Sequence, residues 1–306
     1  MLDADGVEDG RDRIDAHPSP AAAGLRFLMC APRHFAVSYS INPWMDPQAW
    51  GDADGQVAEQ QWAALQRALL AQGAGLEFVE PLPDFPDLVF AANAAVVLDD
   101  KALLARFRHP ERQGEEPVYR AAFLALQARG HLDQVVEVPE GMWLEGAGDC
   151  IFDPWRQQFW MGFGPRSHAG AAQAVTAVFG VECVALELAD PHFYHLDTAF
   201  CALPSGDVIY YPGAFTASGR DAIAERVAHG QRIELDRDEA NEFAANAVPF
   251  DHCIVLSSCS DRLRATLGER GFAVVTTPLQ AFQRSGGSAC CLTLRLDHRS
   301  NRMSPA

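Results

Sequence analysis

The sequence predicts a single globular domain of mixed α/β class. The chain has 306 residues, of which 48% are hydrophobic and 21% charged, so it is long enough to bury a sizeable core. Short apolar runs that are typical of strands alternate with segments whose apolar residues recur at helical spacing. No linker interrupts this alternation, which favours one domain over residues 25–306.

Periodicity predicts the individual elements. In residues 57–72, for example, Trp62, Leu65 and Leu69 fall on one helical face, and Gly73 ends the helix. Further helices are predicted over residues 117–129, 168–179, 218–229, 238–245 and 261–270. Strands are predicted over residues 25–30, 135–138, 150–152, 159–164, 182–188, 208–212, 253–257, 273–277 and 291–296.

Residues 1–24 are rich in Asp, Gly, Pro and Ala and show no periodicity, which predicts a disordered N-terminal extension. The extension carries acidic residues such as Asp3 and Glu8 where a secretory signal would need basic residues and then an apolar run. The chain is therefore expected to be cytoplasmic.

Composition argues against several classes of partner. The net charge of −17 is unsuited to nucleic acid, which needs clustered Lys and Arg, but it suits a small cationic substrate. No segment approaches about 18 consecutive apolar residues, so a membrane span is not expected. The eight cysteines are scattered without a C-x-x-C pair, which predicts neither a zinc site nor a disulfide framework and indicates a reducing compartment. The sequence leaves open whether the chain forms a homo-oligomer.

A cysteine pair near the C-terminal end is the first candidate for chemistry. Gly286 and Gly287 free the backbone, and Cys290 and Cys291 then lead into an alternating strand pattern. A thiol placed where a flexible loop enters a sheet has backbone N–H groups near it, which can stabilise the thiolate of a nucleophile. Two buried core thiols would give the same local pattern, because free cysteine often packs as a small hydrophobe.

The second candidate is the pair His195 and Asp197. In an extended segment these side chains point to one face, whereas Leu196 and Thr198 point to the other. An imidazole and a carboxylate on one face provide acid–base chemistry beside a group that binds a cation. A lone core histidine is the commoner arrangement, but a core face seldom carries both groups.

Four further polar residues stand where they could face a ligand. Asn42 lies in a proline-punctuated loop, and Asn93 is a polar residue within the largely apolar run 85–98. Glu145 precedes a glycine-rich turn, and Arg166 lies at the N-terminal edge of a predicted helix, where an anion is favoured. The first three have an ordinary structural reading as well: a loop that caps the core, a satisfied buried amide and a plain glycine turn.

Taken together, these motifs resemble those of the guanidine-modifying enzymes, which include arginine deiminases, dimethylarginine dimethylaminohydrolases and amidinotransferases. The resemblance runs from about residue 25 to residue 296 and is closest to the bacterial arginine dihydrolase domain. The blocks that carry it are Ile41-Asn42-Pro43-Trp44-Met45, Ala92-Asn93-Ala94, Glu111-Arg112-Gln113-Gly114-Glu115-Glu116, Glu145-Gly146-Ala147-Gly148-Asp149, Phe193-Tyr194-His195-Leu196-Asp197-Thr198, Gly286-Gly287 and Cys291-Leu292-Thr293-Leu294-Arg295.

The resemblance implies a five-bladed α/β propeller, or pentein, of pseudo-fivefold ββαβ modules with the active site in its central channel. It implies that Cys291 is the nucleophile, that His195 is the general acid and base, and that Glu145 orients His195. It implies no metal or organic cofactor. Asn93 is implied to act in both catalysis and substrate binding, and the substrate-binding residues implied are Asn42, Asn93, Arg112, Arg166, Asp197 and Ser285.

Two residues refine this expectation. Cys290 departs from dihydrolase-like sequences, which commonly carry Lys there, and the spacing to Leu292 and Thr293 favours Cys291 as the reacting thiol. Asn93 offers an amide donor to the carbonyl of citrulline, which a carboxylate could not. The interpretation is an arginine dihydrolase that yields ornithine, carbon dioxide and ammonia. The alternatives are a deiminase that stops at citrulline, a dimethylarginine dimethylaminohydrolase, an amidinotransferase, and a non-enzymatic relative, although the last would be expected to have lost one of these polar residues.

Overall fold

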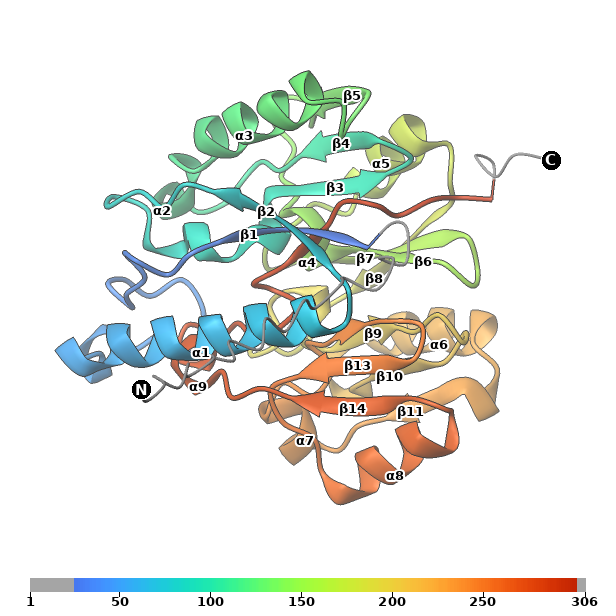
Figure 1. Cartoon of the computed structure of the whole chain (residues 1–306). Coiled ribbons are helices and arrows are strands. Elements are labelled where there is room, and N and C mark those ends of the chain that lie inside the picture. Colours follow the sequence, from blue (N-terminus) through green and yellow to red (C-terminus); the bar gives the residue numbers. More distant parts are fainter. Residues whose placement is uncertain (1–24, 302–306) are drawn as a thin grey trace, which may run out of the picture.

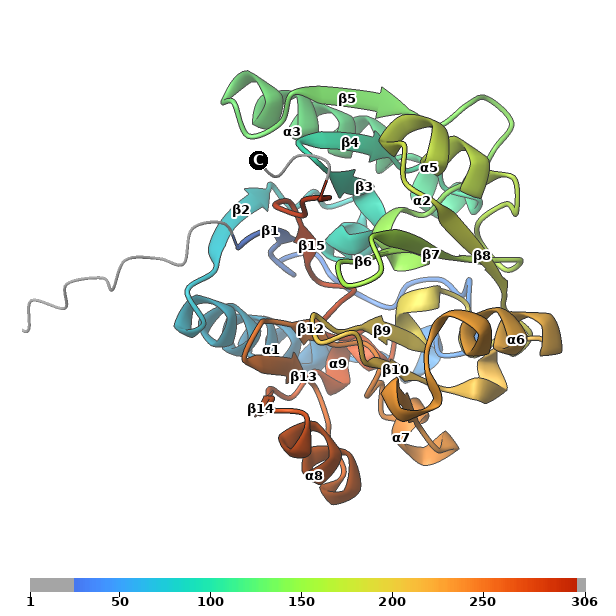
Figure 2. The same cartoon turned by 90° about the vertical axis from the view of Figure 1, so that its right-hand side faces the viewer.

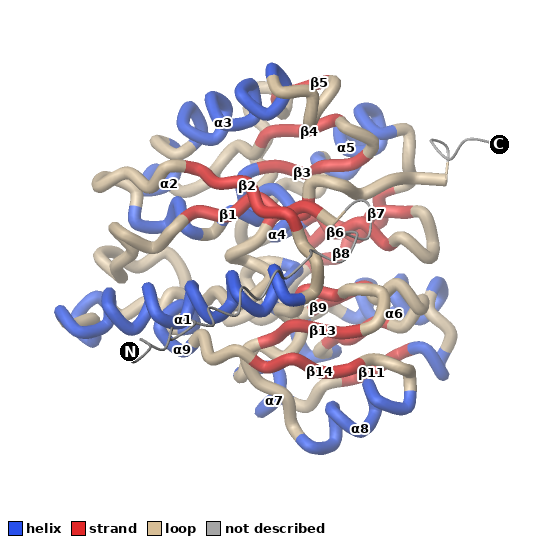
Figure 3. The backbone as a smooth tube through the Cα atoms, in the orientation of Figure 1, coloured by secondary structure: helices blue, strands red, loops and turns tan. Residues whose placement is uncertain are grey.

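The computed structural model describes residues 25–301, so the predicted extension 1–24 lies outside the described residues, as do residues 302–306. Within the described range the chain folds into an α/β structure with five sheets of three strands each. The long helices lie around the outside of these sheets (Figure 1). The same distribution is visible along the backbone, where strands gather in the interior (Figure 3).

The five sheets share one topology. In each, the central strand pairs antiparallel with one neighbour and parallel with the other. The strand β15 completes the sheet of β1, so the two ends of the described chain meet in one sheet. The sheets are β15 (Leu294–Arg295), β1 (Arg26–Cys30) and β2 (Gly75–Val79); β3 (Ala95–Leu98), β4 (Lys101–Leu104) and β5 (Gln134–Glu137); β6 (Cys150–Asp153), β7 (Gln158–Phe163) and β8 (Cys183–Glu187); β9 (Phe200–Ala202), β10 (Val208–Tyr210) and β11 (Arg232–Glu234); and β12 (Val248–Pro249), β13 (Cys253–Leu256) and β14 (Ala273–Thr276).

A helix links the two parallel strands of every sheet, because a parallel pair needs a long crossover connection. These helices lie on the periphery when the molecule is turned by 90° (Figure 2). They are α1 (Asp52–Ala71), α3 (Glu116–Ala128), α5 (Ala171–Phe179), α6 (Ala217–Arg226) and α8 (Asp261–Glu269). The short helices are α2 (Pro110–Gln113), α4 (Gly146–Asp149), α7 (Arg237–Asn241) and α9 (Gln280–Gln283), with the 3-10 helices η1 (Pro47–Ala49), η2 (Pro86–Val89), η3 (Ala91–Ala94), η4 (Leu196–Thr198), η5 (Pro212–Ala214) and η6 (His229–Gln231).

The six predicted helices are confirmed, although α7 is shorter than expected, and the predicted strands are present with small shifts at their ends. Three local expectations were wrong. His195 and Asp197 do not lie in an extended segment, because residues 196–198 form η4. Cys291 lies in a turn before β15 rather than within a strand, and Arg166 precedes α5 by several residues instead of standing at its edge. The predicted strands did not include β2, β3, β4, β9, β11 or β12.

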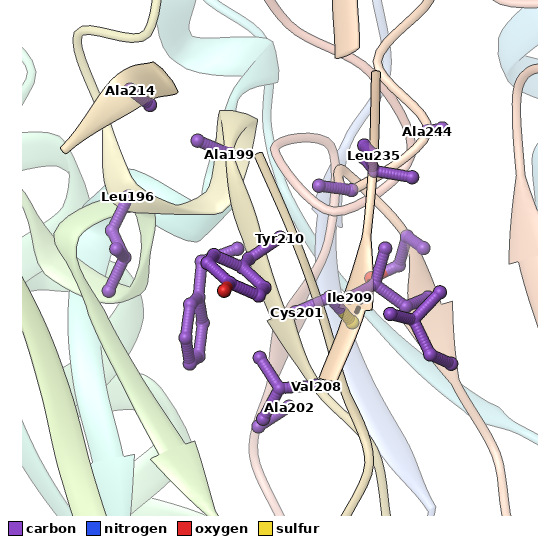
Figure 4. Packing of buried hydrophobic residues seen from close by; sticks show 14 of the residues in the cluster. Leu196, Ala199, Cys201, Ala202, Val208, Ile209, Tyr210, Ala214, Leu235 and Ala244 are labelled. Atoms are coloured by element: carbon purple, nitrogen blue, oxygen red, sulfur yellow. Dashed lines mark hydrogen bonds between the residues drawn. The ribbon is translucent and has the colours of Figure 1, made fainter. Parts of the chain in front are cut away.

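A buried apolar cluster fixes the turn that carries the predicted acid–base pair. Leu196 lies between His195 and Asp197 in the chain, and its side chain is fully buried in a cluster with residues of β9 and β10 (Figure 4). Burying a leucine stabilises the fold by roughly 1.5–3 kcal/mol. This packing holds η4 against the sheet and aims its polar neighbours in the opposite direction, toward the site.

Candidate active site

One pocket brings together most of the residues predicted for the site. Its empty volume is about 260 Å³. The predicted residues that line it are Asn42, Asn93, Arg112, Arg166, His195, Ser285 and Cys291. Glu145 and Asp197 stand just behind this lining, where Glu145 contacts His195 and Asp197 contacts Cys291. Residues far apart in the sequence therefore converge on one pocket.

Cys291 has two polar neighbours at its sulfur. The Sγ atom lies 3.1 Å from Oδ2 of Asp197 and 3.0 Å from Nδ2 of Asn246. The side chain is almost fully buried. Burial, followed by the charge of Asp197, raises the pKa of the thiol well above its usual value. In the empty site the thiol is therefore protonated and donates to Asp197, and it needs a bound cation and a proton acceptor to become a thiolate.

His195 is held by a buried carboxylate. Its Nε2 atom lies 2.8 Å from Oε2 of Glu145, and the same oxygen accepts a hydrogen bond from Nη1 of Arg166 at 2.8 Å. Burial opposes ionisation of Glu145, but the Arg166 guanidinium and the His195 bond outweigh it and hold the pKa of Glu145 below its usual value. Burial lowers the pKa of His195 to about 4 despite Glu145. At neutral pH the ring is neutral, and its Nε2–H donates to the carboxylate, which leaves Nδ1 free to take a proton.

Asp197 is the carboxylate without a cationic partner. It is fully buried, and its Oδ1 atom has no hydrogen-bond partner among the described residues. Burial raises its pKa to about 7, although the hydrogen bond from Cys291 opposes the rise. A buried acid in this state gains much from a bound cation, because the cation restores the charge that burial disfavours.

Replacing Asp197 by Asn is expected to stabilise the empty protein at alkaline pH. The pKa of this carboxyl is raised from the ordinary value of 3.8 to about 7 in the folded protein, so below pH 4 the group does not lower the unfolding free energy. The destabilisation grows between pH 4 and 7 and is complete above pH 7. The variant should therefore gain about 2–4 kcal/mol in unfolding free energy at pH 8 and nothing at pH 4. Urea denaturation at both pH values measures this. A variant that is less stable at pH 8 would contradict the assignment of Asp197 as a desolvated acid.

Asn93 is oriented by an arginine that is itself paired. The Nη1 atom of Arg112 donates to Oδ1 of Asn93 at 2.7 Å, while Nε and Nη2 of Arg112 bind both oxygens of the buried Glu115. Because the amide oxygen is committed to Arg112, the Nδ2 group of Asn93 is turned toward the backbone oxygen of Glu145, at 3.4 Å, and toward the pocket. A side chain on Gly148 would overlap this Nδ2 atom, so the close approach requires glycine there.

Two residues that contact the site were missed by sequence reasoning. Asp87 lines the pocket and accepts hydrogen bonds from Tyr39 at 2.8 Å and Ser285 at 3.4 Å. Asn246 contacts the sulfur of Cys291. An acid within the largely apolar run 85–98 was a signal that could have identified Asp87. Asn246 has no such local signal.

Within residues 25–301, no group of three or more His, Cys, Asp or Glu side chains is arranged to hold a metal ion. None of the described helices is long and apolar enough to cross a membrane.

Comparison with known proteins identifies the family. The sequence matches the family described as N,N dimethylarginine dimethylhydrolase, eukaryotic, over residues 42–297. It is 40% identical over 272 residues to the bifunctional arginine dihydrolase/ornithine cyclodeaminase AgrE of Nostoc sp., a match that covers 89% of this chain and 38% of AgrE. It is 35% identical to the N(G),N(G)-dimethylarginine dimethylaminohydrolase of Mycobacterium tuberculosis, covering 89% of this chain and 85% of that protein.

A solved structure extends the comparison to three dimensions. The N-terminal domain of a variant of the cyanobacterial arginine dihydrolase ArgZ, bound to its substrate, matches with a TM-score of 0.84 and 39% identity over 90% of this chain and 99% of that chain. Fold and sequence thus place the chain among the guanidine-modifying enzymes, as its motifs implied. Within them it belongs to the N,N dimethylarginine dimethylhydrolase family. The chain spans 38% of the length of the bifunctional relative AgrE.

Proposed function

We propose that this chain is an arginine dihydrolase, which converts arginine and two waters to ornithine, carbon dioxide and two molecules of ammonia. One observation carries the proposal: the sulfur of Cys291, the unpaired carboxylate of Asp197 and the Glu145-bound ring of His195 surround one pocket. Relatives named arginine dihydrolase, at about 40% identity, support it.

The proposed reaction begins with binding of the guanidinium beside Asp197. The cation favours the ionised carboxylate and the thiolate of Cys291, whose proton passes to His195. The sulfur attacks the central carbon, and His195 returns the proton to the departing nitrogen, which leaves as ammonia. Neutral His195 then activates a water that hydrolyses the amidino thioether. The product is citrulline, and the thiol is restored.

The second hydrolysis is proposed to use the same residues on citrulline. The ureido group is neutral, and its carbonyl oxygen needs a hydrogen-bond donor, which Nδ2 of Asn93 supplies. Sulfur attack expels the second ammonia and leaves a carbamoyl thioester, and water releases the carbamate of ornithine, which loses carbon dioxide. The oxygen of the same amide has a second lone pair besides the one that accepts from Arg112, and this lone pair is proposed to accept from the guanidinium of arginine.

The remaining substrate contacts stay predictions. Arg112 and Arg166 are proposed to bind the substrate carboxylate, although each already pairs with a buried glutamate, Glu115 and Glu145 respectively. Asn42 donates to the backbone oxygen of Ser285 at 3.1 Å, and both are proposed to complete the pocket wall.

We also propose that residues 25–306 form one catalytic domain in which the five sheets stand around a common axis as a propeller. Five sheets with the same strand order and crossover support this arrangement. A cytoplasmic location, an independence of metal and organic cofactors, and the disorder of the N-terminal extension 1–24 stay predictions from the sequence.

Product analysis tests the proposed function. Pure protein is incubated with arginine, and ornithine, citrulline and ammonia are quantified over time. Two ammonia molecules per ornithine support the dihydrolase, whereas accumulation of citrulline alone would assign a deiminase. The 35% identity to a dimethylarginine dimethylaminohydrolase makes that activity the second candidate, and release of dimethylamine from dimethylarginine in a parallel reaction would favour it. Transfer of the amidino group to an added amine would favour an amidinotransferase.

The Asn93→Asp variant is expected to stop at citrulline. Its carboxylate still accepts from Arg112 and from a guanidinium, but it offers no donor to the ureido carbonyl. We expect ornithine formation to fall by about 100-fold or more, comparable to loss of one donor to a developing oxyanion. Separate assays with arginine and citrulline measure the two steps. Continued ornithine production at the wild-type rate would refute the role of the amide.

A further inference from the structure

The sheet of β12, β13 and β14 is the one for which sequence reasoning named no site residue. In the other sheets, a residue just before the first strand reaches the site: Asn93 precedes β3, Asp197 precedes β9 and Cys291 precedes β15, while Glu145 precedes β6 through α4. Asn246 stands shortly before β12, and the number of residues that separates it from the start of β12 equals the number that separates Asn93 from the start of β3. By the repeated sheet topology, Asn246 therefore holds the position in its sheet that Asn93 holds in the sheet of β3.

Asn246 is fully buried, and its side chain forms two hydrogen bonds with the nucleophile Cys291 and one with Asp197. Its Nδ2 atom donates to Sγ of Cys291 at 3.0 Å and to the backbone oxygen of Asp197 at 3.0 Å. Its Oδ1 atom accepts from the backbone N–H of Cys291 at 3.2 Å. These contacts occupy both hydrogens of the amide nitrogen, so the side chain has a single orientation. The reversed amide would set its oxygen against the Asp197 carbonyl and its N–H groups against the N–H of Cys291.

The chemistry at the sulfur requires such a donor. When the thiol loses its proton, Asp197 at 3.1 Å turns from an acceptor of the S–H bond into a like charge. The amide of Asn246 donates to the same sulfur at 3.0 Å and carries no charge. A hydrogen bond to an ionised group is stronger than one to a neutral group, so this contact favours the thiolate over the thiol.

We infer that Asn246 is a catalytic residue, which donates a hydrogen bond to the sulfur of Cys291 and stabilises the thiolate that attacks the substrate. The inference rests on the proposed function for its consequence in turnover, but not for its effect on the thiol itself. Asn246 does not line the pocket, so it acts on the nucleophile and not on the affinity for the substrate.

The test compares wild type with Asn246→Asp and Asn246→Ala. The Asp variant keeps the acceptor for the N–H of Cys291 but removes the donor and adds a charge, whereas the Ala variant removes both groups. Alkylation by iodoacetamide without substrate is followed against pH, and tandem mass spectrometry of the tryptic peptide 285–295 separates Cys291 from Cys290. We expect the alkylation rate of Cys291 at pH 8 to fall by about 10-fold in the Ala variant and more in the Asp variant.

Turnover provides the second arm. We expect kcat to fall by about 100-fold or more in both variants with KM within about threefold, and the acidic limb of the kcat/KM profile to move to higher pH. Asn241→Asp is the matched control, because it places the same new charge on an exposed residue of α7. It should leave alkylation and turnover unchanged.

The outcomes separate the two proposals. If the wild type does not turn over arginine, the proposed function fails, and the alkylation arm still decides the role of Asn246. If Cys291 of the Asp variant is alkylated as fast as in the wild type at every pH, the inference is wrong. Calorimetric binding of arginine in a Cys291→Ala background, with and without Asn246→Asp, verifies that the pocket is folded; equal affinities within about threefold are expected for a residue outside the binding contacts.

Discussion

Replacing Cys291 by Ala is expected to lower arginine turnover by roughly 10⁴-fold or more, because removing a nucleophile abolishes the covalent route. The pocket should survive, since Asn246, which contacts the sulfur, still bonds the backbone of Asp197 and of residue 291 after the sulfur is lost. Steady-state assays measure the loss, and calorimetry of arginine binding shows that the site is intact. In the wild type, rapid quenching followed by mass spectrometry should find the covalent adduct on Cys291.

Cys290→Ala is the matched control, since it removes the neighbouring thiol. Cys290 does not line the substrate pocket. It lines a separate apolar cavity together with residues of β6 and β9, among them Phe200 and Cys201. Activity within about fivefold of wild type is expected, because this thiol forms no bond with the substrate. If Cys290→Ala abolished turnover and Cys291→Ala did not, the roles of the two thiols would have to be exchanged.

The sequence predicted which residues form the site better than it predicted the backbone conformation that carries them. The sequence pointed to His195 and Asp197 because an imidazole and a carboxylate so close together are unusual in a core. The extended conformation used to align them was wrong, since η4 bends the chain there. Both residues still reach the site, because burial of Leu196 fixes the turn from the opposite side. Tertiary packing overrode a local prediction without changing the functional conclusion.

The pairing of the arginines could not be predicted locally. Arg166 meets Glu145 across a separation of 21 residues, and nothing in either segment signals the other. Asn246 could not be predicted from the sequence either. It precedes a strand of two residues, β12, which is too short to give a hydrophobic pattern. The repeated sheet topology, visible only in the folded chain, is what relates Asn246 to Asn93.

The Glu145→Gln variant is expected to lose both stability and activity. Arg166 is 2% exposed, and its ion pair with Glu145 is a buried one, so removing the carboxylate leaves an uncompensated buried charge. Breaking a buried pair in this way costs about 3–5 kcal/mol of unfolding free energy. The turnover number should fall by about 10²–10⁴-fold, because His195 loses the carboxylate that fixes its tautomer and supports its protonated form. Urea denaturation and steady-state assays measure the two losses.

The pH dependence distinguishes this charge effect from a packing effect. The folded pKa of Glu145 lies below its usual value of 4.5, so its stabilisation is fully present above pH 4.5 and is lost as pH falls through the folded value. The stability difference between wild type and Glu145→Gln should therefore be constant from pH 5 to 8 and shrink below pH 4.5. Glu59→Gln, at an exposed position of α1, should change the unfolding free energy by less than about 0.5 kcal/mol. A deficit in Glu145→Gln that persisted unchanged at pH 3 would have to come from altered packing, and the electrostatic account of the Glu145, Arg166 and His195 triad would then be wrong.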